Sequence, residues 1–258
     1  MLSHVRYLGH STVLIEIDGV SILTDPLLVD RLGLLHRHTA KVAQLIEDIA
    51  VDVVLISHAH HDHLHLPSLR RLRGRPRVVV PRGLGQFVSR SGHDVVEVTA
   101  GERFDIGSVV VHAIRAEHDG RRGPFGPAAE ALGYRIAGSS RVYFAGDTDL
   151  CAEMDGLAGT VDVALLPVWG WGPRLGTGHL DPKRAAEAVL RIRPRIAIPI
   201  HWGTFYPFAI ARFWPHPLGD PPHDFAREAT RIAPQTEVRV LAPGEAMALG
   251  GVANTRNV

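Results

Sequence analysis

The sequence predicts an α/β protein built as a four-layer αβ/βα sandwich, in which two packed β-sheets carry helices on their outer faces. Strand and helix patterns alternate along the chain, and the signals of the second half follow the same order as those of the first. A chain of 258 residues is long enough to bury one sizeable core, so we expect a single domain over residues 1–258.

The first half is predicted to combine β-strands with short helices. Branched, alternating runs flank Asp18-Gly19, which is a strong hairpin signal. Behind Thr39, apolar residues at helical spacing predict an amphipathic helix over residues 39–50, with Val42, Leu45, Ile46 and Ile49 on its inner face. Strands are expected at residues 5–9, 12–18, 20–26, 53–57, 77–81, 95–100 and 108–116, and further short helices near residues 66–72 and 84–90.

The second half repeats this alternation. A hairpin is expected around Gly138-Ser139, and Asp181 followed by Pro182 predicts the N-cap and first residue of a helix. Strands are expected at residues 131–138, 140–147, 161–168 and 195–202, followed by a final pair at 236–242 and 245–250 joined at Pro243-Gly244. The proline-rich stretch 214–224 is predicted to be irregular and exposed.

Composition and charge exclude several classes of protein. Hydrophobic content of 45%, 21% charged residues and a formal charge of +1 describe an ordinary globular chain without a general attraction for polyanions. Cys151 is the only cysteine, which excludes an internal disulfide and a thiolate metal site. The N-terminal sequence MLSHVRYLGHS lacks a signal-peptide pattern and no window resembles a membrane span, so we expect a cytoplasmic protein without integral membrane association. The basic run at residues 69–77 is predicted to be a solvated helix face, and no nucleic-acid partner is expected.

The stretch SHAHHDHL, residues 57–64, places four histidines and an aspartate directly after a buried strand. His58 and His60 point the same way in an extended backbone, so they can bind one ion, whereas Asp62 and His63 project towards a second. Imidazole and carboxylate without thiolate predict two divalent metal ions, with zinc favoured and manganese, iron or nickel as alternatives.

Two ions need more ligands than one loop supplies. Three candidates stand at the ends of other predicted strands, namely His118, Asp147 and His201. Strand ends are rigid supports, and a carboxylate such as that of Asp147 can bridge two cations. The sequence therefore predicts a dinuclear metal site where these strands end.

The motif H-x-H-x-D-H at residues 58–63 resembles the signature of the metallo-β-lactamase-fold superfamily of hydrolases. The resemblance implies the metallo-β-lactamase fold and a particular distribution of ligands. By this resemblance, one metal is held by His58, His60 and His118, the other by Asp62, His63 and His201, and Asp147 bridges them.

Longer segments resemble one branch of that superfamily. The segments YLGHSTVLIEIDGVSILTDPLL, YFAGDTD, GHLDPKRAAEAV and IPIHWGTF are similar to N-acyl phosphatidylethanolamine-hydrolysing phospholipase D and the ascorbate-6-phosphate lactonases. Residues 119–130 have no clear counterpart there. The resemblance implies a hydrolase with a metal-bridging hydroxide that acts on a phosphodiester or lactone, in a small-molecule or lipid-derived anionic substrate. The alternatives are a β-lactamase- or thioesterase-like carbonyl hydrolase and, from another class, a non-catalytic metal- or nucleic-acid-binding module; a homo-oligomer is left open.

Two residues are expected to act in catalysis. Asp62 would ligate a metal and orient the hydroxide. His179 stands just before the helix that begins at Pro182, and the resemblance places a functional histidine in this GHLDP context. It is expected to bind substrate or transfer a proton, with a structural contact to the helix end as the alternative.

Several further residues leave two interpretations open. His10 either packs as a hydrogen-bonded residue or touches the site, and Asp25 either orients a ligand histidine or caps a turn. His61 should point away from the metals. The aromatic residues near the predicted site strands either line an apolar pocket or close the core: Trp169, Trp171, Trp202, Phe205 and Tyr206.

Overall fold

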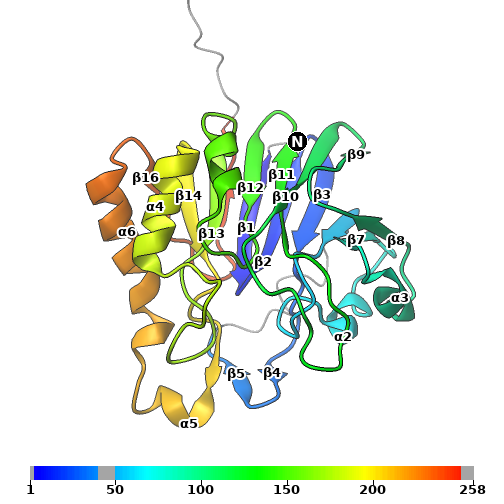
Figure 1. Ribbon diagram of the computed structural model, residues 1–258, viewed down its shortest axis with the longest axis horizontal. Coiled ribbons are helices and arrows are strands. Elements are labelled where there is room, and N and C mark those ends of the chain that lie inside the picture. The colour runs from blue at the N-terminus through cyan, green and yellow to red at the C-terminus, as the bar shows by residue number, and fades with distance from the viewer. Residues whose placement is uncertain (1–2, 40–49, 251–258) are drawn as a thin grey trace, which may run out of the picture.

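Two seven-stranded sheets face each other at the centre of the molecule (Figure 1). The structure is a computed structural model that describes residues 3–39 and 50–250. In spatial order, the first sheet contains β17 (Ala246–Ala248), β1 (His4–Gly9), β2 (Thr12–Ile17), β3 (Val20–Thr24), β6 (Val53–Leu55), β7 (Arg77–Pro81) and β8 (Val95–Val98). The second contains β16 (Glu237–Val238), β14 (Ile196–Ile200), β13 (Val163–Pro167), β12 (Arg141–Phe144), β11 (Leu132–Ala137), β10 (Val109–Arg115) and β9 (Arg103–Ile106).

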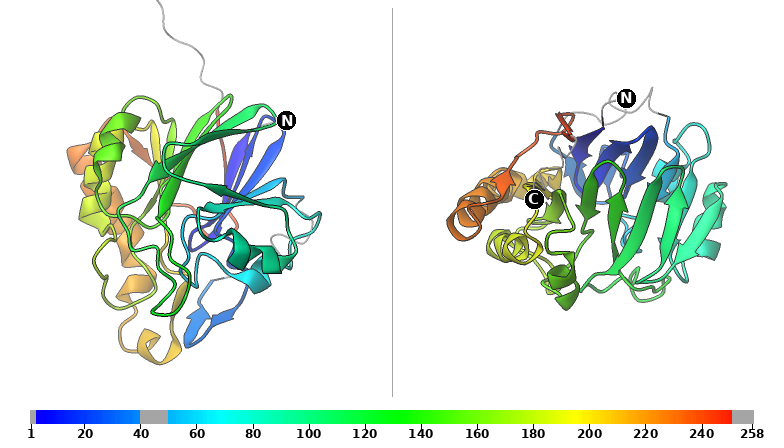
Figure 2. Two further views of the ribbon diagram at one scale, coloured as in Figure 1. Left: turned by 45° about the vertical axis from the view of Figure 1, so that its right-hand side comes forward. Right: turned by 90° about the horizontal axis from the view of Figure 1, so that it is seen from above.

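Helices cover the outer face of each sheet, as the two further views show (Figure 2). On the first sheet, a buried apolar layer joins the strands to α2 (Leu66–Leu69) and α3 (Gly85–Val88), which is followed by η1 (Ser89–Ser91). On the second sheet, an equivalent layer lies under η2 (Ala152–Leu157), α4 (Pro182–Ile192) and α6 (Asp220–Ile232). The predicted four-layer αβ/βα sandwich is therefore confirmed.

The main core lies between the two sheets. Alternate residues of each strand point inward, and Tyr7, Ile15, Tyr134 and Phe144 are among the fully buried members of this layer. Burial of each such side chain contributes on the order of 1.5–3 kcal/mol, so the paired sheets form a firm support for the loops at their edges.

The helix predicted at Pro182 is confirmed. Asp181 caps it, because its side chain accepts a hydrogen bond from the backbone N–H of Arg184, and Pro182 occupies the first turn. The helix predicted over residues 39–50, with Val42, Leu45, Ile46 and Ile49, falls on residues outside the described part of the chain, apart from its two ends.

Two predictions for the C-terminal region differ from the structure. The strands expected at 236–242 and 245–250 are present as the shorter β16 and β17, and they belong to different sheets, because β16 pairs with β14 and β17 pairs with β1. The stretch 214–224 is not irregular throughout, since η3 (His216–Leu218) lies in it and α6 begins at Asp220. Pro221 and Pro222 are buried in the first turn of α6, where the missing N–H groups of proline leave no hydrogen bond unmade.

A small third sheet, not predicted from the sequence, consists of β4 (Arg31–Leu32), β5 (Leu35–Arg37) and β15 (Phe205–Pro207). It lies with α5 (Phe208–Ala211) at the bottom of the view in Figure 1, at the end of the molecule away from the N-terminus. Strands β1, β3, β6, β12 and β14 are followed at this end by the polar residues discussed next. No helix within residues 3–39 and 50–250 is long and apolar enough to cross a membrane.

Candidate metal centre

Loops after strands of both sheets bring all the predicted ligands together. From the first sheet, residues 58–63 follow β6; from the second, His118 follows β10, Asp147 follows β12 and His201 follows β14. The donor atoms form overlapping groups whose members lie within 4.8 Å of one another. The fold thus brings the predicted ligands together where these strands end, although His58 and His201 are 143 positions apart in the sequence.

The three-histidine group consists of His58, His60 and His118. Nε2 of His118 lies 3.2 Å from Nδ1 of His60, and the ring centroids of His58 and His118 are 4.7 Å apart. His58 is fully buried, whereas His60 and His118 are half-buried. This group therefore lies between the core and the surface, where one side stays open to a substrate.

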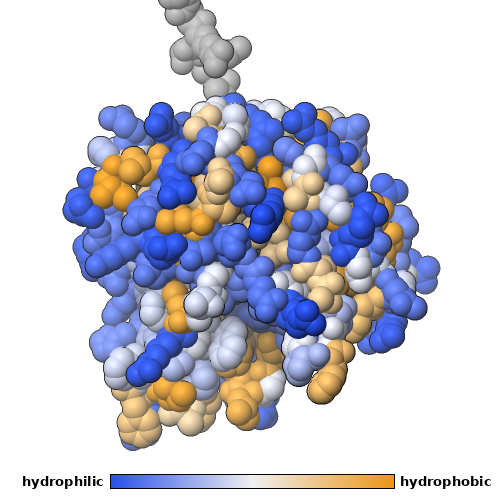
Figure 3. All heavy atoms as spheres, in the orientation of Figure 1, coloured by the Kyte–Doolittle hydropathy of each residue, from blue (hydrophilic) through white to orange (hydrophobic). Residues whose placement is uncertain are grey.

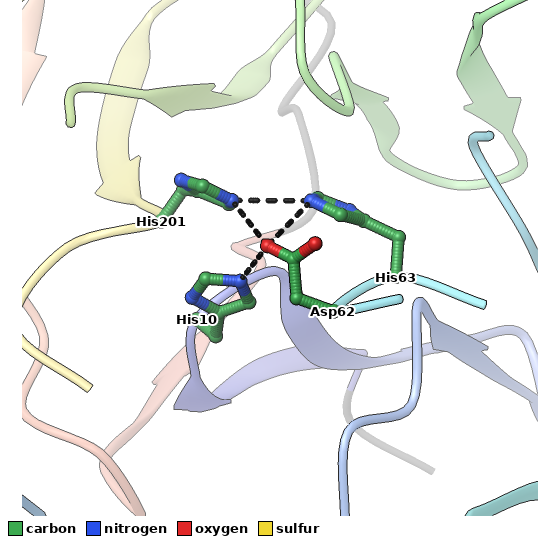
Figure 4. Close-up of side chains that lie close together, drawn as sticks. All are labelled: His10, Asp62, His63 and His201. Atoms are coloured by element: carbon green, nitrogen blue, oxygen red, sulfur yellow. Dashed lines mark hydrogen bonds and ion pairs between the residues drawn. The ribbon is translucent and has the colours of Figure 1, made fainter. Parts of the chain in front are cut away.

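The second group consists of Asp62, His63 and His201, joined by His10 (Figure 4). Nε2 of His63 lies 3.1 Å from Nε2 of His201, and Oδ2 of Asp62 lies 3.5 and 3.6 Å from these two atoms. All four side chains are buried. Three candidate ligands and the ring of His10, from three separate segments, therefore converge on one point.

Asp147 lies between the two groups. One carboxylate oxygen is 3.2 Å from Nε2 of His63 and the other is 3.3 Å from Nε2 of His201, while His58 belongs to the same cluster. This is the position that a bridging carboxylate would occupy. The division of ligands between two ions stays a prediction.

The hydrogen bonds around the cluster fix which nitrogen of each ring faces inward. The Nδ1–H of His63 donates to Asp25 at 2.7 Å. The Nδ1–H of His201 donates to the carbonyl of Trp169 at 3.0 Å, and that of His118 donates to the carbonyl of Gly178 at 2.8 Å. In the neutral rings, Nε2 then carries a lone pair directed at the centre of the cluster. Such outward hydrogen bonds are typical of histidines that bind metals.

Unsatisfied buried atoms show that these residues fit a cation. Nε2 of His58 and Oδ1 of Asp147 are buried without a hydrogen-bond partner among the described residues. Nε2 of His63 and Nε2 of His201 face each other at 3.1 Å, so in the neutral rings their two lone pairs need a positive charge, a proton or a cation, between them. Nitrogen and oxygen donors of this kind, without thiolate, suit zinc and similar divalent ions.

The electrostatics of the site also favour positive charge. Burial alone would raise the pKa of Asp62 and Asp147, but the neighbouring histidines hold the pKa of both carboxyls well below its usual range. Burial alone would lower the pKa of His63, whereas Asp147 and Asp62 raise it well above 6.5. Both carboxylates are therefore ionised at neutral pH and can neutralise bound cations.

Asp25 orients two of the histidines. It accepts the Nδ1–H of His63 directly, and Ser57 Oγ, which lies 2.5 Å from Oδ2 of Asp25, also lies 2.9 Å from Nδ1 of His58. Because the carboxylate only accepts, Ser57 donates to Asp25 and accepts from His58. Of the two interpretations left by the sequence, the structure shows the contact to a histidine of the motif, and through Ser57 Asp25 also reaches His58.

His10 touches the site, which resolves the two interpretations left by the sequence. Its Nε2–H donates to Oδ2 of Asp62 at 2.8 Å, and its ring centroid lies 4.0 Å from that of His201. Burial, followed by the charge of His201, lowers the pKa of His10 to about 4, so the ring is neutral. His10 and His201 both have positive φ, 57° and 61°, and the N–H of His201 donates to the carbonyl of His10. Non-glycine residues held in this conformation are common at functional sites.

His179 lies at the open side of the cluster. Its Nε2 is 3.6 Å from Oδ2 of Asp147, its ring centroid is 4.7 Å from that of His118, and its Nδ1 lies 3.1 Å from the carbonyl of Thr177. It is half-buried just before α4 and forms a further group of possible metal donors with His118 and Asp147. A role in substrate binding or proton transfer stays a prediction.

Residues 119–130, which had no assigned role, support the metal-ligand loop from outside. Arg122 Nη1 donates to the carbonyls of Ala59 and Leu64, both at 2.7 Å, and its Nη2 lies 2.9 Å from Nδ1 of His61. His61 is exposed, contacts Arg122 and belongs to none of the groups of possible metal donors among the described residues. Sequence analysis missed Arg122, because nothing in DGRRGPFG marks one of two adjacent arginines.

The aromatic residues near the site divide between the two roles considered. Trp171 lines a groove of about 450 Å³ that reaches His60 and Asp62, together with Leu32 and Leu35. The others do not line this groove; Phe205 and Tyr206, for example, are buried with only 1% of their surface exposed.

The fold and this cluster together define the class: a protein of the metallo-β-lactamase fold with a candidate metal centre. A sequence model described as the beta-lactamase superfamily domain matches residues 21–202. The chain belongs to the metallo-β-lactamase superfamily.

Several proteins are similar in sequence over most of this chain. A metal-dependent hydrolase of Methanopyrus kandleri is 31% identical over 249 residues, covering 93% of this chain and 97% of the relative. An N-acyl-phosphatidylethanolamine-hydrolyzing phospholipase D of Caenorhabditis elegans is 29% identical over 237 residues, 82% of this chain and 66% of the enzyme. Uncharacterized proteins of Mycobacterium bovis and Mycobacterium tuberculosis are 32% identical, and the match spans 61% of their length.

Solved structures share the fold. A metallo hydrolase from Ignicoccus hospitalis has 25% identity and a TM-score of 0.74, with 96% of this chain and 98% of that one covered. A diiron β-hydroxylase from Streptomyces venezuelae has 22% identity and a TM-score of 0.71, covering 96% of this chain and 54% of that one. The second likeness concerns the fold alone.

Proposed function

We propose that this protein is a metal-dependent hydrolase that cleaves a phosphodiester or a lactone with two divalent ions, zinc being the favoured metal. One observation carries the proposal, the convergence of histidine ring nitrogens and two ionised carboxylates in overlapping groups whose donor atoms lie within 4.8 Å of one another. Similarity to the nematode phospholipase, whose name specifies hydrolysis of a phosphatidylethanolamine, supports the phosphodiester. The second candidate reaction, lactone hydrolysis, is supported by the resemblance of the GHLDP and HWGTF segments to lactonases.

Bound divalent ions would supply Lewis acidity and a water of lowered pKa. Asp62, held ionised and fixed by the N–H of His10, accepts a hydrogen bond from the attacking water and orients it. His58, His60 and His118 would hold one ion, Asp62, His63 and His201 the other, and Asp147 would join them.

His179 is the protein group best placed to meet the leaving group. Its Nδ1–H is directed at the carbonyl of Thr177, which leaves Nε2 towards the cluster, and the half-buried ring stays accessible to a substrate. We propose that it binds the anionic part of the substrate and, when protonated at Nε2, donates a proton to the departing oxygen.

Metal analysis combined with a substrate panel tests this function. Protein purified without added metal should contain about two divalent ions per chain and should cleave bis-p-nitrophenyl phosphate or γ-butyrolactone until a chelator removes the ions. Nitrocefin and an acyl thioester in the same panel test the carbonyl-hydrolase alternatives. Metal-loaded protein that cleaves neither the diester nor the lactone would contradict the proposal.

A further inference from the structure

A pocket separate from the metal centre lies on the outer face of the second sheet. Its volume is about 530 Å³, and its lining comes mainly from β9, β10, β11 and η2. None of the described residues that line it belongs to a group of possible metal donors. We propose that this pocket binds a small organic anion, whose charged group lies between Arg103 and Arg135 and whose apolar part lies over Ile114 and Leu157.

Two arginines and a histidine stand side by side in this pocket. His112 on β10 is the register partner of Arg103 on β9 and of Arg135 on β11, and all three residues line the pocket. Neighbouring strands lie about 4.8 Å apart, so the backbones of Arg103 and Arg135 are about 10 Å apart with His112 between them. Side chains of register partners share one face of a sheet. The two guanidinium groups can therefore approach one anion from opposite sides.

The two arginines have no carboxylate of their own. Arg103 and Arg135 form no ion pair within residues 3–39 and 50–250, whereas the neighbouring Arg141 is paired with Asp162 at 2.7 Å. Burial, followed by the positive charges of Arg141 and Arg103, lowers the pKa of Arg135, against the opposing charge of Asp162. Guanidinium groups in one row without a carboxylate between them repel each other, and a bound anion would relieve this repulsion.

The lining as a whole carries excess positive charge. Glu153 is the one acidic residue among the described residues that line the pocket, whereas three of them are arginines: Arg103, Arg115 and Arg135. Arg115 already has a partner outside the lining, because its Nη2 lies 3.5 Å from a carboxylate oxygen of Glu117. The charge available to a ligand is therefore that of the other two arginines.

The side chain of Arg135 is already oriented. Its Nε donates to the carbonyl of Thr160 at 3.1 Å, and its Nη1 and Nη2 make no hydrogen bond to the described part of the chain. The free end of a guanidinium matches two oxygens of a phosphate or a carboxylate. Because the half-buried side chain is held before a ligand arrives, binding costs little of its conformational freedom.

The rest of the lining suits an organic body attached to the anion. Ile114 and Leu157 are 8% and 4% exposed and belong to the apolar layer between the second sheet and its helices. Over β10–β12, in the upper half of Figure 3, hydrophilic side chains surround small apolar patches. Small-molecule sites measure about 300–1,000 Å³. A pocket of about 530 Å³ thus has room for more than an inorganic ion.

Titrations of zinc-loaded protein with three probes test the inference. Phenylphosphonate carries a charge and an apolar ring on a P–C bond that resists hydrolysis, inorganic phosphate lacks the ring, and benzyl alcohol lacks the charge. The imidazole NMR signals of His112, assigned with His112→Gln, report binding in this pocket and not at the metal centre. They should shift with phenylphosphonate at about tenfold lower concentrations than with inorganic phosphate, and stay unchanged with benzyl alcohol.

Variants locate the charged group of the ligand. Arg103 is exposed and makes no hydrogen bond or ion pair through its side chain to the described residues, so Arg103→Gln removes a charge without removing a structural contact. The affinity for phenylphosphonate, measured at His112, should fall about tenfold or more in Arg103→Gln and in Arg135→Gln. Arg73, also exposed and without such contacts, lies outside the pocket, so Arg73→Gln is the matched control and should retain wild-type affinity.

The result is independent of the proposed hydrolysis, because His112 is not part of the metal centre. Unshifted His112 signals at high phenylphosphonate concentrations, or equal affinities of Arg103→Gln and Arg73→Gln, would overturn the inference. Equal affinities for inorganic phosphate and phenylphosphonate would overturn its apolar part. A single-stranded oligonucleotide that shifts the His112 signals where phenylphosphonate does not would replace the small anion with a polyanion.

Discussion

Asp25 and His63 form a buried pair in which the carboxylate oxygen Oδ2 lies 2.7 Å from Nδ1 of the ring. Neither side chain has any exposed surface. The same carboxylate accepts the backbone N–H of Ser57 at 2.7 Å and, through the Ser57 hydroxyl, reaches His58. The carboxylate of Asp25 therefore orients the rings of two histidines, His63 directly and His58 through Ser57, so that Nε2 of each ring faces the cluster.

Replacing Asp25 should weaken metal binding without removing a ligand. Asp25→Asn keeps the shape of the side chain but removes its charge, so that it no longer favours Nδ1–H on His63. Metal affinity should fall roughly 10- to 100-fold, measured by competition with a chromogenic chelator. Asp94→Asn, at an exposed aspartate paired with Arg77, is the control and should bind metal as the wild type does.

Loss of a predicted ligand should change the number of bound ions. His58→Ala removes a buried nitrogen from the three-histidine group, and Asp147→Ala removes the carboxylate between the groups. Elemental analysis should show a fall from about two ions per chain to about one in His58→Ala and to one or fewer in Asp147→Ala. Unchanged metal content in either variant would show that the site is wrongly assigned.

The predicted ligands could be found from the sequence because they lie in a short motif or at the ends of strands with strong apolar patterns. Four of them lie within the six residues 58–63. Their spacing indicates that the side chains of His58 and His60 point towards one ion and those of Asp62 and His63 towards a second. The alternation of strands and helices predicted the sandwich for the same reason, since it depends on patterns that repeat over short windows.

The partners in the contacts that support those ligands could not be read from the sequence. His10 meets Asp62 across 52 positions, and Arg122 meets the carbonyl of Ala59 across 63. No periodicity links such pairs, because the tertiary fold brings them together. The short length and the pairing of β16 and β17 could not be predicted for a related reason: their partners are distant strands in different sheets.

His10 should affect the second metal group through Asp62. His10→Asn removes the ring that donates to Oδ2 of Asp62, and asparagine tolerates the positive φ of this position, so backbone strain does not account for the result. We expect about tenfold weaker binding of one ion of two and a lower kcat. Titration calorimetry on metal-free protein separates the two binding steps; equal losses at both would indicate a general disturbance of the fold.

Asp162 should contribute stability that depends on pH. Its carboxylate accepts hydrogen bonds from the backbone N–H, Nε and Nη2 of Arg141. Burial by itself raises the pKa of Asp162, but these bonds lower it below its usual value of 3.8. A depressed folded-state pKa means that the stabilisation is present above about pH 4–5 and is lost as the pH falls towards the folded-state value.

Urea unfolding of Asp162→Asn measures this contribution. At pH 7 the variant should be less stable than the wild type by roughly 1–3 kcal/mol, and the difference should narrow between pH 5 and pH 4 or below as the wild-type carboxylate is protonated in the unfolded chain. A chelator in all samples removes the separate effect of metal loss. A difference that is constant or grows on acidification would contradict the assignment.

Arg122 should couple residues 119–130 to metal binding. Its guanidinium holds the carbonyls of Ala59 and Leu64, which lie on either side of the segment 60–63, and it also contacts His61. Arg122→Gln cannot reach both carbonyls, because the amide lacks the length and the fork of donors. Stability should fall by roughly 2–4 kcal/mol. Because the ligand loop is then less ordered, metal affinity should fall as well.

The adjacent arginine separates this effect from a change in charge. Arg121 is exposed, and its side chain makes no hydrogen bond or ion pair to the described ligand loop, so Arg121→Gln should retain wild-type stability and metal affinity. Arg122→Lys, which keeps the charge but not the fork, should be intermediate. Chelator competition on all three variants gives the decisive comparison. If Arg122→Gln and Arg121→Gln bind metal equally well, the arginine stabilises the surface of the fold but does not position the ligands, since only a positioning role moves metal affinity.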